Sequence, residues 1–185
     1  MLFRSKTIVS ETRGLKTAPF HPDFKGGWVF SGTEGIIAGT SLFDPEGKLV
    51  RTFEGRGESH FANFLKAVRS RKVSDLNADI LEGHQSTALC HISNISYRLG
   101  APAGPAEIER QLDRLDVHDL VRETFEHTCR HLAGNGVDLE KTPLTLGSLL
   151  RIDPGREAFL DNGRADALLT RTYRRPFVVP AEGEA

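Results

Sequence analysis

The sequence changes its pattern once, near residue 58, and the order of the two patterns most constrains the fold. Residues 28–57 hold short β-branched and aromatic runs that glycines interrupt. Residues 58–136 instead carry apolar side chains at helical spacing. Strands followed by helices are typical of an α+β domain, in which helices cover one face of a largely antiparallel sheet.

The chain has 185 residues, enough for one domain with a core. We therefore predict a single α+β domain over 1–185, with an open sheet built mainly from the N-terminal third. Strands dominate 1–57, helices dominate 58–136, and an extended tail with short elements occupies 137–185.

Local signals place the elements within this frame. The segment "DPEGK" (44–48) predicts a hairpin over 41–53, because Pro45 suits a type I turn and Gly47 suits the left-handed position after it. A long strand is predicted over 2–13. Helices are predicted over 59–72, 77–100, 105–115 and 116–136. The tail adds a short strand at "LLRIDP" and a short helix at "NGRADALLT".

The stretch 77–100 is unusual because it is a long helical pattern with few charges. On a helical wheel His84 and His91 fall inside the apolar stripe, while small residues and Tyr97 lie on the opposite side. A surface helix normally has a charged face. We therefore predict a helix packed on two sides, whose second partner is the sheet, another helix, another subunit or a domain absent from this chain.

The histidines do not predict a metal site. His84 and His91 are two helical turns apart, roughly 10 Å, too far for one zinc ion. His127 and His131 have the i, i+4 spacing of paired ligands, but Thr128, Cys129 and Arg130 stand where a zinc protease would carry its glutamate. For His127 and His131 we favour a solvated helix face. For His84 and His91 we favour structural hydrogen bonding over a role in binding a ligand or handling a proton.

Other motifs are weak. "GRGESH" (55–60) could hold an anion at a helix start, although a flexible connection is favoured. The arginines of "LTRTYRRPF" (169–177) could grip a carboxylate or phosphate, although an exposed basic segment is favoured. No motif predicts a reaction.

Composition narrows the class of protein. A net charge of -1 does not provide the excess positive charge expected of a protein that binds nucleic acid or an anionic membrane. No apolar run in the sequence is long enough to span a bilayer. The N-terminus lacks the apolar core of a signal peptide, which favours a soluble, cytoplasmic protein, although a leader could precede an upstream domain. Cys90 and Cys129 could form one disulfide, but two buried free thiols in a reducing compartment are favoured.

Four blocks resemble, in order, the C-terminal region of a branch of the Gfo/Idh/MocA oxidoreductases, the glucose–fructose oxidoreductase and inositol dehydrogenase family. They are "ETRGLKTAPF", "SHFANFLKAVRSRKVSDLNADILEGHQSTALCHISNISYRLG", "HLAGNGVDLEKTPLTLGSLLRIDP" and "RTYRRPFVVP". The resemblance covers nearly the whole chain, and the long second block is its specific part.

The resemblance implies an N-terminal Rossmann domain that binds NAD(P) and a C-terminal α+β domain that shapes the substrate pocket and often mediates oligomerisation. Only the second is matched here, so we expect no Rossmann domain in this chain. The family's glycine motif, Glu-Lys-Pro motif and aspartate/histidine helix lie upstream, and "EKTP" (140–143) is not that motif because Thr142 interrupts it. No catalytic or cofactor-binding residue is carried over.

The expected function is therefore the substrate-pocket and oligomerisation domain of an NAD(P)-dependent oxidoreductase acting on a sugar or polyol-like substrate. We expect the chain alone to be inactive, to hold no cofactor or metal, and to pair with a missing or separate Rossmann domain as a homo-oligomer. A stand-alone, non-catalytic binding or oligomerisation module is the alternative. Candidates for the substrate or interface side are His60, His84, His91 and Tyr97.

Overall fold

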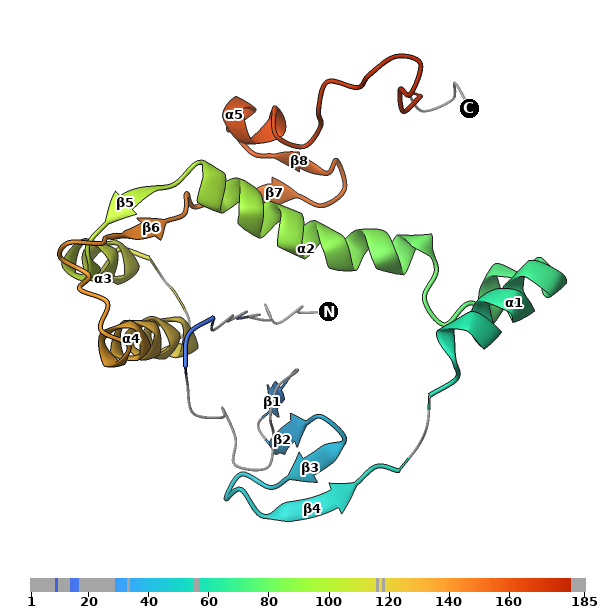
Figure 1. The fold of residues 1–185 in the computed structure, drawn as a ribbon, viewed down its shortest axis with the longest axis horizontal. Coiled ribbons are helices and arrows are strands. Elements are labelled where there is room, and N and C mark those ends of the chain that lie inside the picture. The colour runs from blue at the N-terminus through green and yellow to red at the C-terminus, as the bar shows by residue number, and fades with distance from the viewer. Residues whose placement is uncertain are drawn as a thin grey trace. The chain divides into compact units, whose positions relative to one another are not determined.

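The chain is α+β, with antiparallel strands in open sheets and a set of helices, as the sequence predicts (Figure 1). The structure is a computed structural model that describes residues 9, 14–16, 29–32, 34–54, 57–115, 117 and 119–180. Apart from Val9, the strand predicted over 2–13 lies outside the described residues. None of the helices in these ranges is long and apolar enough to cross a membrane.

The chain divides into two compact units. Glu11–Asp79 form what we call the sheet unit, and Met1–Ser10 with Ile80–Ala185 form the helical unit. The single domain predicted over 1–185 stays a prediction, as does the helical cover over one face of the sheet.

The sheet unit contains a four-stranded antiparallel sheet in the order β1-β2-β3-β4. Its strands are β1 (Val29–Gly32), β2 (Gly35–Ala38), β3 (Ser41–Phe43) and β4 (Leu49–Thr52). Neighbouring strands in sequence are neighbours in the sheet, because short turns favour antiparallel pairing. The glycines between the predicted strands thus mark real turns.

The predicted hairpin over 41–53 is confirmed as β3 and β4. Asp44 organises the turn, because its Oδ1 accepts from the backbone N–H of Lys48 at 2.7 Å and its carbonyl from that of Gly47 at 3.0 Å. Gly47 has φ +83°, the left-handed conformation expected of it. Phe43, at the end of β3, is buried.

Helix α1 (His60–Ser70) and the short 3₁₀ helix η1 (Val73–Asp75) complete the sheet unit. Ser59 holds the N-cap position, but its side chain makes no cap hydrogen bond. The apolar stripe of α1 is exposed to different degrees, most of all at Phe61, which is 82% exposed. Its members are Phe61, Phe64, Leu65 and Val68.

Asn63 is the one buried polar residue among the described residues, and it joins α1 to η1. Its Nδ2 donates to Glu58 Oε2 and to the carbonyl of Asp75, both at 2.8 Å. Its Oδ1 accepts from the backbone N–H of Asn77 at 3.1 Å. These three hydrogen bonds fix the turn after α1, because without them the polar groups that they join would lack partners.

We expect Asn63→Ala to lower the free energy of unfolding by about 1–2 kcal/mol, because it leaves the Asp75 carbonyl and the Asn77 N–H unpaired. Urea titration followed by circular dichroism measures the change. Asn77→Ala is the matched control, since it removes only a 3.3 Å contact to Glu58 and keeps the backbone bond. Equal losses in the two variants would contradict the role given to Asn63.

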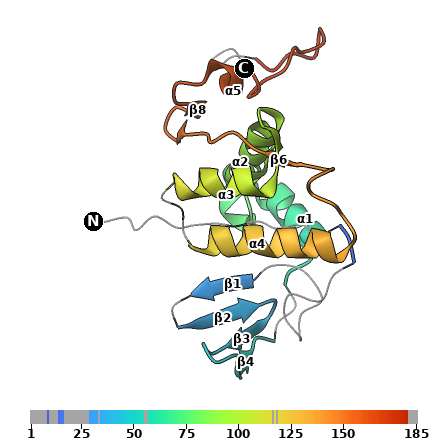
Figure 2. The same cartoon turned by 90° about the vertical axis from the view of Figure 1, so that its left-hand side faces the viewer.

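The helical unit begins with α2 (Ile80–Arg98). It continues with β5 (Ala101–Ala103), α3 (Pro105–Asp113), α4 (Asp119–Gly134), β6 (Leu144–Leu146), β7 (Ile152–Asp153), β8 (Ala158–Phe159) and α5 (Gly163–Asp166). The predicted helices are confirmed with shorter ends, and α3 and α4 lie side by side (Figure 2). Arg122 connects these two helices through Asp113 Oδ1 at 2.6 Å.

The core of the helical unit lies against the C-terminal half of α2. Ile95, Phe159 and Ala165 are buried together. In Figure 1, β7, β8 and α5 lie next to the C-terminal half of α2. Asn162 caps α5 by accepting from the N–H of Ala165 at 3.0 Å, so the short helix predicted at "NGRADALLT" is confirmed.

The two-sided packing predicted for 77–100 is not what the described residues show. Only one side of the C-terminal half of α2 is packed, and the apolar residues Ile80, Leu81 and Leu89 are exposed. Cys90 is also exposed and Cys129 half-buried, so the prediction of two buried thiols is wrong. Cys90 lies on the small-residue side of α2, which the structure leaves open to solvent.

Candidate functional site

The four candidate residues lie in two places. His60 opens α1 in the sheet unit, whereas His84, His91 and Tyr97 lie along α2 in the helical unit. All four are exposed. His84 and His91 share one face of α2 but are separated by two turns, and Tyr97 is on the opposite side. The structure therefore does not gather them into one site.

His84 instead has a partner that the sequence did not reveal. Its Nε2 lies 2.8 Å from Oε1 of Glu157, a residue 73 positions later in the turn between β7 and β8. No local signal connects these two residues, because nothing in either segment specifies that the turn meets α2. The turn itself could be read from "DPGRE", but its partner could not.

The β7–β8 turn holds Glu157 in a defined position. Asp153 Oδ1 accepts from the backbone N–H groups of Gly155 and Arg156, at 2.9 and 3.2 Å. Glu157 has φ +48°, a left-handed conformation that is uncommon for a residue with a side chain. Two residues later Phe159 enters the core, and its N–H donates to Asp166 Oδ1 at 2.7 Å. The hairpin is thus anchored on both sides of Glu157.

When His84 is neutral, the direction of its hydrogen bond with Glu157 is defined. A carboxylate only accepts, so Nε2 carries the proton and donates to Glu157, which leaves Nδ1 as an acceptor. The side chains are 51% and 64% exposed, so solvent screens their attraction and the pair adds little to stability. Its hydrogen bond favours the tautomer of the imidazole in which Nε2 carries the proton.

An open hollow of about 690 Å³ lies beside this pair. Its lining comes entirely from the first turns of α2 and consists of Ile80, Leu81, Gly83, His84 and Thr87. Thr87 Oγ1 donates to the carbonyl of Gly83 at 2.7 Å. The hollow therefore combines apolar side chains with an imidazole and a hydroxyl, and lysine and arginine are missing from its lining.

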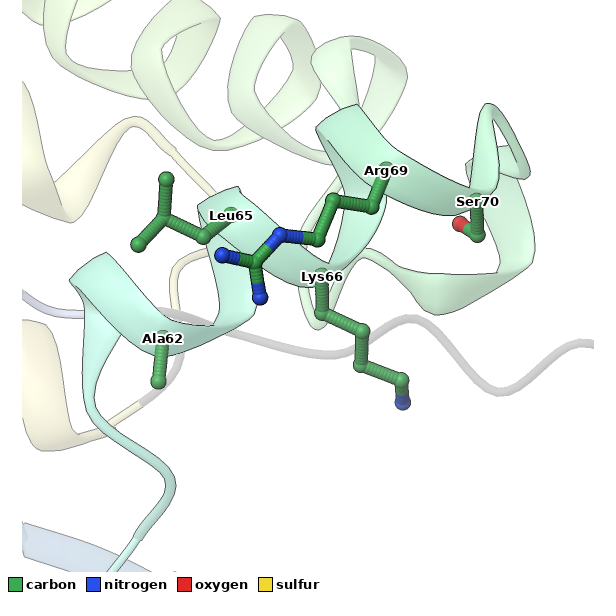
Figure 3. A pocket seen from close by; sticks show the side chains of 5 residues that line it. All are labelled: Ala62, Leu65, Lys66, Arg69 and Ser70. Carbon is green, nitrogen blue, oxygen red and sulfur yellow. The ribbon is translucent and has the colours of Figure 1, made fainter.

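A second hollow, of about 540 Å³, runs along α1 and differs in charge. It is lined by Ala62, Leu65, Lys66, Arg69 and Ser70, all from one helix (Figure 3). Lys66 lies 3.7 Å from Asp75 of η1. Because a single helix supplies every wall of each hollow, both are surface grooves rather than enclosed sites.

The remaining sequence candidates form no site. Among the residues that the structure describes, no group of three or more His, Cys, Asp or Glu side chains could hold a metal ion. His131 contacts the side chain of Asn135 rather than a metal partner. Partial burial and the nearby Glu109 raise the pKa of the Cys129 thiol, which disfavours the reactive thiolate.

Two of the three arginines in 169–177 contact aromatic rings. Arg171 lies over Tyr173 at 5.5 Å, and Arg174 over Phe177 at 5.3 Å, each measured to the ring centroid. Of "GRGESH", only 57–60 lie within the described residues, so the anion site considered there lies partly outside them.

Comparison of the chain with protein-family models, with curated proteins and with solved structures finds no match. The candidate site therefore rests on its own geometry: a hydrogen-bonded imidazole and carboxylate beside an open, largely apolar groove on α2.

Proposed function

We propose that this chain is the substrate-pocket and oligomerisation domain of an NAD(P)-dependent oxidoreductase of the Gfo/Idh/MocA type. Its substrate would be a sugar or a polyol-like compound. A Rossmann domain, missing from this chain or supplied by a separate one, would bind the cofactor. The proposal is supported by the resemblance of 59–100 to that family and by the α+β fold with its open antiparallel sheets.

One observation carries the proposal furthest. Helix α2 comes from the most family-specific block, yet its first half exposes Ile80 at 88% and Leu81 at 56%. Apolar area of this kind favours burial, at about 25 cal/mol per Å². A neighbouring cofactor domain resting on this half of α2 would bury it and would place the hollow beside His84 between the two domains.

In this role the chain supplies binding and orientation. The nicotinamide, when bound to its own domain, supplies hydride transfer. Nothing in the chain is assigned as a catalytic residue, and the chain alone is not expected to turn over substrate.

Titration of NADH and NADPH with the purified chain tests this division of labour. We expect no change in nicotinamide fluorescence across the micromolar range, because the dinucleotide site belongs to the other domain. Free nicotinamide fluorescence in buffer is the control. Saturable binding in the micromolar range would contradict the proposal.

The alternative is a stand-alone module that binds or oligomerises without catalysis. The observation that favours it is the edge strand β4, whose four residues are all exposed and include the apolar Leu49 and Val50. Exposed edges of this kind favour pairing with another chain. Light scattering distinguishes part of this alternative, since a strict monomer at high concentration would contradict self-association.

A further inference from the structure

We propose that helix α1 is a self-association surface, on which two copies of this chain pack their α1 helices antiparallel about a two-fold axis. The expectation of a second copy rests on the proposed function, which includes oligomerisation without assigning a surface to it. The surface itself rests on the exposure of α1 and on the distribution of charge along it.

Helix α1 turns a polar side toward its own unit and its apolar side toward solvent. Asn63, the buried residue of the helix, donates to the carbonyl of Asp75 in η1. The centre of the apolar stripe lies about 150° around the helix from Asn63, and every member of the stripe is at least 41% exposed. A helix of 11 residues is marginal in water unless its apolar side is packed. A partner over the stripe would therefore stabilise the helix itself.

The spacing of the stripe fits a second helix. Its members recur at i, i+3, i+4 and i+7, the spacing by which one helix packs into the groove of another. A two-fold axis that passes between Phe64 and Leu65 would place each Phe61 at the level of the partner's Val68. The two stripes then have equal length and cover each other from end to end. A second copy thus supplies an apolar surface of matching size.

Charge selects the antiparallel arrangement. The acidic Glu58 precedes the helix, and no acidic residue occurs in 60–72. The other end of the helix carries the exposed basic residues Arg69, Arg71 and Lys72. Parallel copies would bring these like charges together, which opposes association. Antiparallel copies place the partner's Arg71 at the level of Glu58, so opposite charges meet at both ends of the contact.

Both charged ends are set by the local structure. The carboxylate of Glu58 is held at the start of α1, since its Oε2 accepts from Asn63 Nδ2 at 2.8 Å. Arg71 ends the helix with φ +58°, and its N–H donates to the carbonyl of Ala67 at 2.9 Å. Glycine is usual at this left-handed position, because a Cβ there costs free energy. An arginine instead keeps a positive charge where the partner's Glu58 is expected.

Sedimentation velocity of the full chain over the micromolar range, in low and in high NaCl, tests the proposal. We expect a monomer–dimer equilibrium whose dissociation constant rises in high salt, because salt screens the attraction between Glu58 and Arg71. A strict monomer, or a dimer that becomes tighter in high salt, would overturn it. So would a monomer that co-sediments with phosphatidylserine vesicles, because the stripe would then belong to a lipid surface.

Phe64→Glu places a charge at the centre of the paired stripes and should weaken the dimer roughly a hundredfold, because each dimer contains the change twice. Val50→Glu is the matched control, since Val50 lies on β4 in the same unit and is 59% exposed, against 61% for Phe64. Circular dichroism should show both variants folded, because neither side chain is buried. A dimer that survives Phe64→Glu, or that Val50→Glu weakens equally, would contradict the assignment to α1.

Arg71→Gly separates the role of the charge from the stability of the helix. Glycine suits the left-handed position, so the dilute monomer should unfold at a higher urea concentration. The dimer should nevertheless weaken roughly fivefold, because two exposed ion pairs are lost. A dimer of unchanged affinity would rule out the antiparallel arrangement.

The outcomes of this experiment and of the NADH titration are independent. A dimer through α1 together with micromolar NADH binding would contradict the division of labour in the proposed function and leave the surface standing. A strict monomer that binds no NADH would contradict the surface and leave that division standing.

Discussion

Phe159→Ala is expected to lower the free energy of unfolding of the helical unit by about 3–5 kcal/mol, the usual cost of removing a buried phenylalanine. Phe159 is 4% exposed and packs with Ile95 and Ala165. This small cluster, with the half-buried apolar residues around it, is the main apolar core of the unit. No large side chain among the described residues is fully buried. A domain whose total stability is about 5–15 kcal/mol has little reserve against such a loss.

The change should be concentrated in the C-terminal half of α2, in the β7–β8 hairpin and in α5. Hydrogen exchange should therefore increase most in these elements, while urea titration gives the overall loss. Phe177→Ala is the matched control, since Phe177 is 69% exposed and its removal should alter stability by less than about 0.5 kcal/mol. A similar loss in both variants would show that Phe159 is not the centre of a core.

The elements that the sequence predicts well are those defined by their own residues. The β3–β4 hairpin follows from Asp44, Pro45 and Gly47, which set the turn without help from elsewhere. Helix α5 follows in the same way from Asn162, whose side chain caps it. Helices α3 and α4 follow from their apolar spacing and from the Pro and Gly residues at their ends.

The features that the sequence does not predict depend on distant partners. Strand β5 is the segment Ala-Pro-Ala, a weak strand former that becomes a strand because β6 pairs with it, Ala101 opposite Leu146. The same holds for the candidate site. His84 could be chosen from its place on a helix, but Glu157 becomes a site residue only when the β7–β8 turn reaches α2.

The wheel of α2 shows the limit of periodicity. Helical spacing placed Ile92, Ile95 and Leu99 on one apolar side, and these residues pack in the core. It also placed His84 and His91 on that side, although both are exposed in the structure. Periodicity tells which residues share a face, whereas burial depends on how far along the helix its partners extend. Here the partners cover only the C-terminal half.

Gly100→Ala should have the second large effect, a loss of about 2–3 kcal/mol, because it inserts a methyl group where the backbone leaves no room. An alanine Cβ at this position would overlap the carbonyl oxygen of Leu146 and lie 3.0 Å from Cα of Gly147. Both neighbours are backbone atoms, which cannot rotate away as a side chain could. The methyl group must therefore displace the end of α2 from β6.

The surrounding hydrogen bonds show what this displacement would break. The carbonyls of Ser96 and Leu99 accept from the N–H and the hydroxyl of Ser148, at 3.0 and 2.8 Å. Ser96 Oγ donates to the carbonyl of Ser148 at 2.7 Å. These bonds satisfy carbonyls at the end of a helix that would otherwise be unpaired. We therefore expect the pairing of β5 with β6 to loosen together with the last turn of α2.

Gly83→Ala is the matched control, since Gly83 lies in the same helix and an added Cβ would meet nothing within 4 Å. Alanine in a helix interior is favoured over glycine, so this variant should gain about 0.5–1 kcal/mol. Urea titration of the two variants measures the opposite signs, and hydrogen exchange locates the loss in β5 and β6. If Gly100→Ala also gained stability, the close approach of α2 to 146–148 would be wrong, because a gain requires open space at that Cβ.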